Sequence, residues 1–186
     1  MSLVGVLALQ GGFKEHIQSI HRAGGIARAV RTLKDAKQCD AFILPGGEST
    51  VISRMMCEEG LDDFLYQAIA RKKLVWGTCA GAILLGPKYL QAVDMHIQAN
   101  AYGSQQASFQ AKVLSKHKQL CTDGWFIRAP KILSTSAQVL ATLADQSIVA
   151  VKSGSVFVTT FHPELTDDLV WHQYFLANLK AEVIDA

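Results

Sequence analysis

Residues 72–86, KKLVWGTCAGAILLG, give the clearest indication of how this chain folds and where its chemistry lies. An apolar run ends at Gly77, Cys79 follows between two small residues, and a second apolar run begins after Gly81. A G-x-nucleophile-x-G pattern between a strand and a helix is typical of a nucleophile elbow, a turn so sharp that only small neighbours fit. Such an elbow presents its nucleophile at the carboxyl edge of the sheet, where α/β folds bind ligands. The stretch therefore predicts Cys79 as a nucleophile, and a buried structural cysteine is the alternative.

The rest of the chain supports an α/β fold. Alternating strands and helices in the first half predict a parallel sheet covered by helices on both faces. The second half is rich in strand-like segments, and it closes with a predicted helix over 166–183 that has Asp167 and Asp168 in its first turn. We expect a single domain over 1–186, a three-layer sandwich around a mostly parallel central sheet with a small antiparallel addition. The strands predicted in the first half are 3–9, 27–30, 40–47 and 74–77.

Composition excludes several classes of function. Hydrophobic residues make up 49% of the 186 residues and charged residues 18%, as in ordinary globular proteins. The net charge of +2 is too small to predict a nucleic-acid partner, and the apolar run 3–9 is too short to span a membrane. None of the four cysteines has CxxC or zinc-finger spacing. We therefore expect no metal site, no cofactor and a reduced, cytoplasmic location.

A cysteine nucleophile needs a base, and His162 is the best candidate among six histidines. It follows an apolar strand in the sequence FHPEL, and Glu164 comes two residues later. In an extended segment, residues i and i+2 point the same way, so the Glu164 carboxylate can orient the imidazole as the third member of a triad. A strand-end histidine beside a solvated glutamate is the alternative. We expect the other histidines at the surface or at the rim of the core: His16, His21, His96, His117 and His172.

Acyl transfer also needs donors for an oxyanion. One is the N–H of the residue after the nucleophile, Ala80. The second is expected in the loop LPGGEST, residues 44–50, where Gly46 and Gly47 let backbone amides approach a ligand. We assign the oxyanion hole to Gly47 and Ala80. A plain turn before a helix capped by Ser49 or Thr50 is the alternative interpretation of this loop.

These motifs together resemble a known family. The sequences GTCAGA, LPGGEST and FHPEL are similar to those of class I glutamine amidotransferases, whose fold is flavodoxin-like. The motifs GVLALQGGFKEH, NAYGSQ, FIRAP and TTFHPELTDD narrow the resemblance to the glutaminase subunits of pyridoxal 5′-phosphate synthase. The resemblance extends from residue 4 to about residue 175.

The resemblance implies a reaction and a partner. In this family a cysteine, here Cys79, attacks the carboxamide of L-glutamine, and His162 moves the proton to the leaving ammonia while Glu164 orients the imidazole. Water then cleaves the glutamyl thioester. The family delivers ammonia to a (β/α)8-barrel synthase subunit in a large hetero-oligomer. Docking through the LQGG region completes the oxyanion hole, which makes Gln10 and Gly11 the expected interface residues.

The family motifs also predict which residues bind glutamine, and this chain departs from them in three places. Ala99 stands where the family has an arginine that helps to hold glutamine, Ser104 replaces a second basic residue, and Gln110 replaces a glutamate. Loss of a charge-assisted contact costs about 1.5–3 kcal/mol, so we expect a raised KM for glutamine with intact chemistry. The residues expected to line the glutamine site are Gly46, Gly47, Glu48, Ser49, Ile127 and Arg128.

Three other functions remain open at this point. The chain could be a glutaminase subunit that serves another synthase, although FIRAP and LQGxxxEH argue against this. The altered QANAYGSQ segment keeps open a non-catalytic regulatory subunit that docks to the synthase. A free-standing cysteine hydrolase with a similar elbow is the third alternative.

Overall fold

The computed structural model describes residues 2–102, 108–117 and 120–184. Five of its strands form the parallel half of one mixed sheet, as the alternating pattern predicts. These strands are apolar, and β3 and β4 are buried along their whole length because helices cover both faces of the sheet. Their order across the sheet is β2 (Ile26–Val30), β1 (Leu3–Leu7), β3 (Ala41–Leu44), β4 (Val75–Thr78) and β11 (Val156–Thr159).

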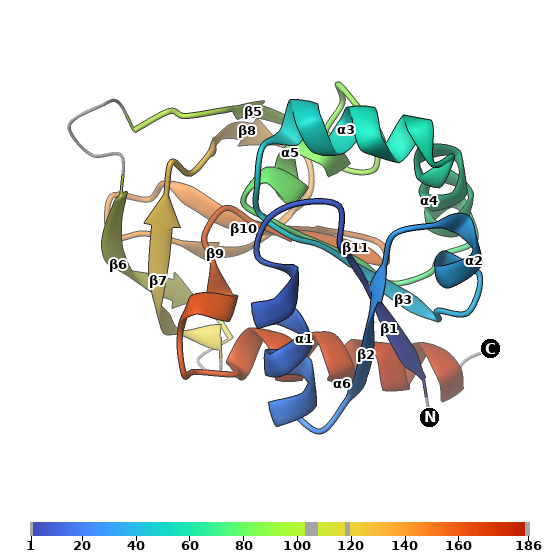
Figure 1. Cartoon of the computed structure of the whole chain (residues 1–186). Helices are drawn as coiled ribbons and strands as arrows, with labels where there is room; N and C mark the ends of the chain where they lie inside the picture. Colours follow the sequence, from blue (N-terminus) through green and yellow to red (C-terminus); the bar gives the residue numbers. More distant parts are fainter. Residues whose placement is uncertain (1, 103–107, 118–119, 185–186) are drawn as a thin grey trace.

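Helices on the two faces give the molecule its three layers (Figure 1). One face packs against α1 (Phe13–Arg22) and α6 (Val170–Ile184), which contribute Ile20 and Phe175 to a buried apolar cluster. The opposite face holds the second buried cluster. Its helices are α2 (Leu33–Ala36), α3 (Ser49–Glu58), α4 (Leu61–Ala70) and α5 (Ala80–Leu85).

An antiparallel extension continues the sheet beyond β11. The strands β10, β9, β6 and β7 follow in that order, and β8 pairs with both β10 and β5. The predicted fold class is therefore confirmed, although the pattern did not reveal β5 or β8. The bounds of these strands are β5 (Met95–Gln98), β6 (Ser108–Ser115), β7 (Thr122–Ile127), β8 (Lys131–Thr135), β9 (Gln138–Thr142) and β10 (Ile148–Ser153).

Two local predictions near the carboxyl end were wrong. The last helix begins at Val170, so Asp167 and Asp168 precede it rather than forming its first turn. The Asp168 carboxylate accepts a hydrogen bond from the Val170 N–H at 3.1 Å. Residues Pro163–Leu165 form a short 3-10 helix, η3, where an extended segment was expected, because proline at the first position favours a helical turn.

Candidate active site

The turn between β4 and α5 places Cys79 at the carboxyl edge of the sheet. Cys79 has φ 48° and ψ −106°, a conformation that non-glycine residues rarely adopt and that costs about 1–3 kcal/mol. Its backbone N–H donates to the Thr159 carbonyl at 2.9 Å, which ties the turn to β11. A Cβ on Gly77 would lie 2.4 Å from the Gly81 oxygen, and one on Gly81 would lie 1.9 Å from the Leu44 oxygen. The two glycines are thus required by the close approach of strand, turn and helix.

His162 follows β11, and its imidazole lies beside both Cys79 and Glu164. His162 Nδ1 lies 2.7 Å from Glu164 Oε1. Burial disfavours charge on the imidazole, but hydrogen bonds to Cys79 and Glu164 outweigh it and raise the pKa of His162 to about 10. The expected contact with Glu164 therefore exists, although the residues reach it through the turn of η3 and not through an extended strand.

Glu164 lies beneath this pair, almost fully enclosed. Burial alone would raise the pKa of its carboxyl group, but the interactions with His16 and His162 hold that pKa below its usual range. The carboxylate is thus ionised and has an imidazole on each side. Gly12 closes over it, since a Cβ there would lie 2.9 Å from Glu164 Oε1.

His16 and His172 contradict the expectation that they lie at the surface or rim, because both are fully buried. His16 Nε2 lies 3.2 Å from Glu164 Oε2, and His16 Nδ1 lies 3.0 Å from His172 Nε2. Burial lowers the pKa of His172 to about 3, with a contribution from His16. The sequence held a signal for His16, since it lies between Phe13 and Ile20 at helical spacing, on the apolar side of α1.

A pocket of about 340 Å³ opens above Cys79 and His162. Arg128 and Ala99 both line it, and the side chain of Ala99 is only a methyl group. Ser104 lies outside the described residues, and Gln110 lies on β6 away from the pocket lining. All the residues assigned from sequence to substrate, oxyanion or partner contacts line this pocket: Gln10, Gly11, Gly46, Gly47, Glu48, Ser49, Ala80, Ala99, Ile127 and Arg128.

Two loops that follow β1 and β3 hold each other at the mouth of this pocket. Gln10 Oε1 accepts a hydrogen bond from the Glu48 N–H at 2.7 Å, and the Gly12 N–H donates to the Gly46 carbonyl at 3.3 Å. Gly11 has φ 86°, and a Cβ there would lie 1.7 Å from the Gly46 oxygen. The loop that carries Gln10 and Gly11 is therefore in direct contact with the loop assigned to the oxyanion.

Comparison with known proteins agrees with this geometry. The family model described as "SNO glutamine amidotransferase family" matches residues 6–181. The chain belongs to the SNO glutamine amidotransferase family. The resemblance derived from the motifs is thus confirmed at the level of the family.

Relatives of this SNO family member are similar along nearly their whole length. A protein of Caldicellulosiruptor bescii named "Pyridoxal 5'-phosphate synthase subunit PdxT" is 42% identical, with 96% of this chain and 99% of the relative covered. A protein of the same name from Clostridium acetobutylicum is 43% identical over 93% of this chain and 98% of its own. A solved structure described as "Crystal structure of glutamine amidotransferase" is 36% identical, with a TM-score of 0.89 over 95% of this chain and 98% of the other.

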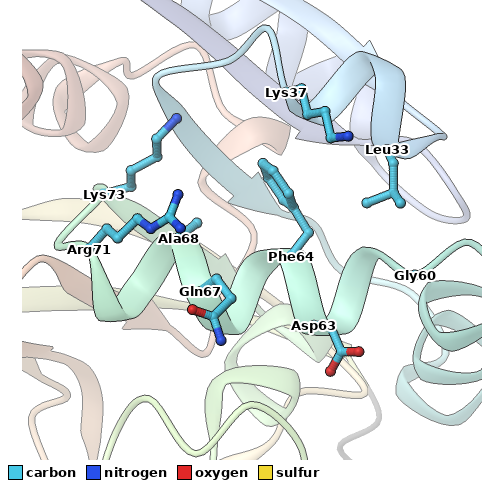
Figure 2. A pocket seen from close by; sticks show the side chains of 9 residues that line it. All are labelled: Leu33, Lys37, Gly60, Asp63, Phe64, Gln67, Ala68, Arg71 and Lys73. Carbon is cyan, nitrogen blue, oxygen red and sulfur yellow. The ribbon is translucent and has the colours of Figure 1, made fainter.

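This SNO family member also has a larger hollow, of about 640 Å³, beside α2 and α4 (Figure 2). Figure 2 shows Phe64 pointing from α4 toward the segment that carries Leu33 and Lys37. Lys73 at its rim donates to the Cys39 carbonyl at 2.6 Å. The lining includes none of the residues around Cys79, so the smaller pocket is the candidate active site despite its size.

Two further features are absent from the described ranges 2–102, 108–117 and 120–184. No group of three or more His, Cys, Asp or Glu side chains in these ranges could hold a metal ion. None of the helices in the same ranges is both long and apolar enough to cross a membrane.

Proposed function

We propose that this chain is the glutaminase subunit of a pyridoxal 5′-phosphate synthase and hydrolyses L-glutamine to L-glutamate and ammonia. The observation that carries the proposal is the grouping of Cys79, His162 and Glu164 at the base of a pocket lined by the LPGGEST and FIRAP segments. The names of relatives that match along nearly the whole chain support the choice of synthase.

The reaction follows from the protonation of the site. His162 is an imidazolium at neutral pH because of its neighbours, so it already holds the proton that the leaving ammonia needs. The sulfur attacks the carboxamide carbon, and His162 gives its proton to the nitrogen as the C–N bond breaks and ammonia leaves. The neutral His162 then takes a proton from water, whose oxygen attacks the thioester carbon. Cleavage of the C–S bond releases glutamate and restores the pair.

Recognition of glutamine falls to the rim of the pocket. The Arg128 guanidinium offers a planar fork to the substrate carboxylate, and Glu48 offers an acceptor to the substrate ammonium group. Ala80 is the first residue of α5, so its N–H has no carbonyl partner within the helix and is free to donate to an oxyanion. Gly47 supplies the second donor in this proposal.

The ammonia formed here goes to a partner in this proposal. The partner is the (β/α)8-barrel synthase subunit of a cytoplasmic hetero-oligomer, which docks on the loop of Gln10 and Gly11. Because Gln10 holds the Glu48 N–H, contact with this loop can alter the neighbouring peptide of Gly47. Docking and activity are then coupled through one side chain.

A non-catalytic regulatory subunit is the second candidate, and Ala99 is the observation that favours it. Its methyl group leaves the wall of the pocket without the arginine that the family resemblance leads us to expect. The grouping of Cys79, His162 and Glu164 argues against this candidate, because a chain without catalytic duty has no need to keep a strained cysteine beside a buried ion pair.

The deciding experiment measures glutamate release from L-glutamine by this chain with and without the synthase subunit of the same organism. We expect release only in the presence of the partner, and none from the Cys79→Ala variant, which provides the control for contaminating glutaminases. Binding of the partner without release would favour the regulatory subunit. Equal release by Cys79→Ala from preparations free of other glutaminases would exclude Cys79 as the nucleophile.

A further inference from the structure

The buried side of the active site contains a second imidazole that the reaction above does not use. Glu164 has two carboxylate oxygens, and each lies beside a different histidine. Oε1 lies 2.7 Å from His162 Nδ1, and Oε2 lies 3.2 Å from His16 Nε2. Oε2 has no well-aligned hydrogen bond among the described residues, because the same His16 nitrogen also lies 3.0 Å from Thr78 Oγ1. His16 is therefore the nearest donor for the second oxygen of a buried anion.

The hydrogen-bond network assigns the proton positions of this histidine pair. His172 Nδ1 is buried without a partner among the described residues, and its Nε2 faces His16 Nδ1 at 3.0 Å. A buried N–H without an acceptor is far less tolerable than a bare nitrogen lone pair, so Nε2 of His172 carries the hydrogen. His16 Nδ1 is then the acceptor, and His16 Nε2 must hold the hydrogen that points toward Thr78 and Glu164.

The surroundings hold this pair in one orientation. The Trp76 ring contacts both imidazoles edge-on, with centroid distances of 5.5 Å to His16 and 5.0 Å to His172. Trp76 itself is fixed because its indole N–H donates to Thr159 Oγ1 at 3.2 Å. The rings therefore cannot rotate freely, and His16 Nε2 stays between Thr78 Oγ1 and Glu164 Oε2.

We propose that His16 is a positioning residue of the active site: its Nε2–H holds Oε2 of Glu164 so that Oε1 faces His162, and His172 fixes the tautomer of His16. This role rests on the proposed function but concerns only the triad. His16 touches neither the pocket nor Cys79 and acts through Glu164. Without this donor, a buried carboxylate would keep only one partner and could turn away from His162.

Several titratable and charged groups surround Glu164, and a test of the proposal must separate their effects. His162 faces the carboxylate from its own segment, His16 from α1, and His172 stands behind His16 on α6. Arg22, on α1, also acts electrostatically on His172. A loss of packing at α1 must therefore be distinguished from a loss of the single donor at His16 Nε2.

The experiment compares three variants of the full chain. His16→Leu removes the donor, His16→Gln replaces it with an amide N–H, and Ile20→Ala disturbs the packing of α1 without touching Glu164. Alkylation of Cys79 by iodoacetamide is followed across pH 5.5–9.5 by the mass of the peptide that contains Cys79. This readout needs neither glutamine nor the partner, and the peptide mass separates Cys79 from the exposed Cys57.

We expect His16→Leu to slow alkylation at pH 7 by about tenfold, the effect of one pKa unit, and to make it rise more steeply with pH than in the unmodified chain. We expect His16→Gln to recover most of that loss and Ile20→Ala to keep the original pH profile despite a lower Tm. An unaltered profile in His16→Leu, or the same change in Ile20→Ala, would overturn the proposal. If alkylation behaves as expected but the complex with the synthase releases no glutamate, the proposed function fails while the role of His16 stands.

Discussion

The two sides of the Cys79–His162 pair are built in opposite ways. The pocket side is made of loops and opens to solvent, with Ala99 and Arg128 exposed on its rim. The rear side consists of Glu164, His16 and His172, which are enclosed between the sheet and two helices. Chemistry thus depends on a closed network, and substrate selection depends on an open surface that can change with little effect on the fold.

Burial explains why the two sides tolerate change differently. On the rear side, removal of one partner leaves another polar group without water or a hydrogen bond, which costs about 1–3 kcal/mol in addition to the lost contact. On the pocket side, water replaces a lost contact, so the cost falls on ligand binding alone. Substitutions on the two sides should therefore separate kcat from KM.

Gly46 stands where the two sides meet, and Gly46→Ala should have the largest effect. The new Cβ would lie 2.4 Å from His162 Cε1 and 3.2 Å from Cys79 Cβ, so the imidazole must move. We expect kcat to fall by about 100-fold or more, in the range that general acid–base catalysis contributes. Glutaminase assays with the synthase subunit measure this loss.

Gly24→Ala is the matched control for a glycine substitution. Gly24 has φ 84°, but a Cβ there meets no atom within 4 Å. We expect about 1 kcal/mol of lost stability from backbone strain and an unchanged kcat. Equal losses of kcat in the two variants would refute the steric argument for Gly46.

Arg128→Asn tests the contribution of the pocket side to glutamine binding. Arg128 has φ 45°, which asparagine tolerates better than most residues, so the backbone should keep its conformation. Removal of the guanidinium should raise the KM for glutamine by about 10- to 100-fold, corresponding to a charge-assisted hydrogen bond, and should leave kcat within about threefold. A selective fall in kcat would instead place Arg128 in the chemical step.

Ala99→Arg tests the same side by adding a contact. An arginine at this position of the pocket wall can reach the substrate carboxylate, and we expect the KM to fall by about tenfold. Gln98→Arg adds the same charge one residue away, at a position that does not line the pocket, and serves as the control. An unchanged KM in Ala99→Arg would contradict the expectation that the methyl group weakens glutamine binding.

The sequence predicted the pocket side better than the rear side. The elbow around Cys79 and the LPGGEST loop depend on local requirements for small residues, which short motifs record directly. The parallel strands were predictable because burial on both faces leaves an uninterrupted apolar run. The strands β5 and β8 were missed because they pair with each other at the border of the sheet and carry mixed polar and apolar residues.

The rear side is formed by residues that are far apart in the sequence and meet only in the folded chain. His16, Thr78 and His172 are separated by 62 and 94 positions along the chain, and no spacing rule connects them. Thr78 and His172 look ordinary in their own strand and helix, and His16 stands out only by its place on the apolar side of α1. Their roles appear only when α1, β4 and α6 are packed around Glu164, which is why the two buried histidines were expected at the surface or at the rim of the core.

The smallest change at neutral pH is expected from His172→Gln, which keeps a donor for His16 but does not titrate. Because burial lowers the pKa of His172 to about 3, the imidazole stays neutral in the folded chain while it takes up a proton near pH 6.5 when unfolded. Its neutral form therefore costs stability as the pH falls from about 6.5 toward 3, and almost none at pH 7. This contribution lowers the free energy of unfolding by about 2 kcal/mol between pH 7 and pH 5.

Urea unfolding at the two pH values measures this difference. The unmodified chain should lose about 2 kcal/mol more than His172→Gln does between pH 7 and pH 5, because the raised pKa of His162 acts equally in both proteins and cancels. Ile20→Ala provides the comparison for altered packing, and its loss over the same interval should equal that of the unmodified chain. An equal loss in His172→Gln would show that His172 is already charged in the folded state. The neutral form with a hydrogen-free Nδ1 would then be wrong, because an imidazolium carries a hydrogen on both nitrogens. The rear side would lose the feature that sets it apart from the pocket side.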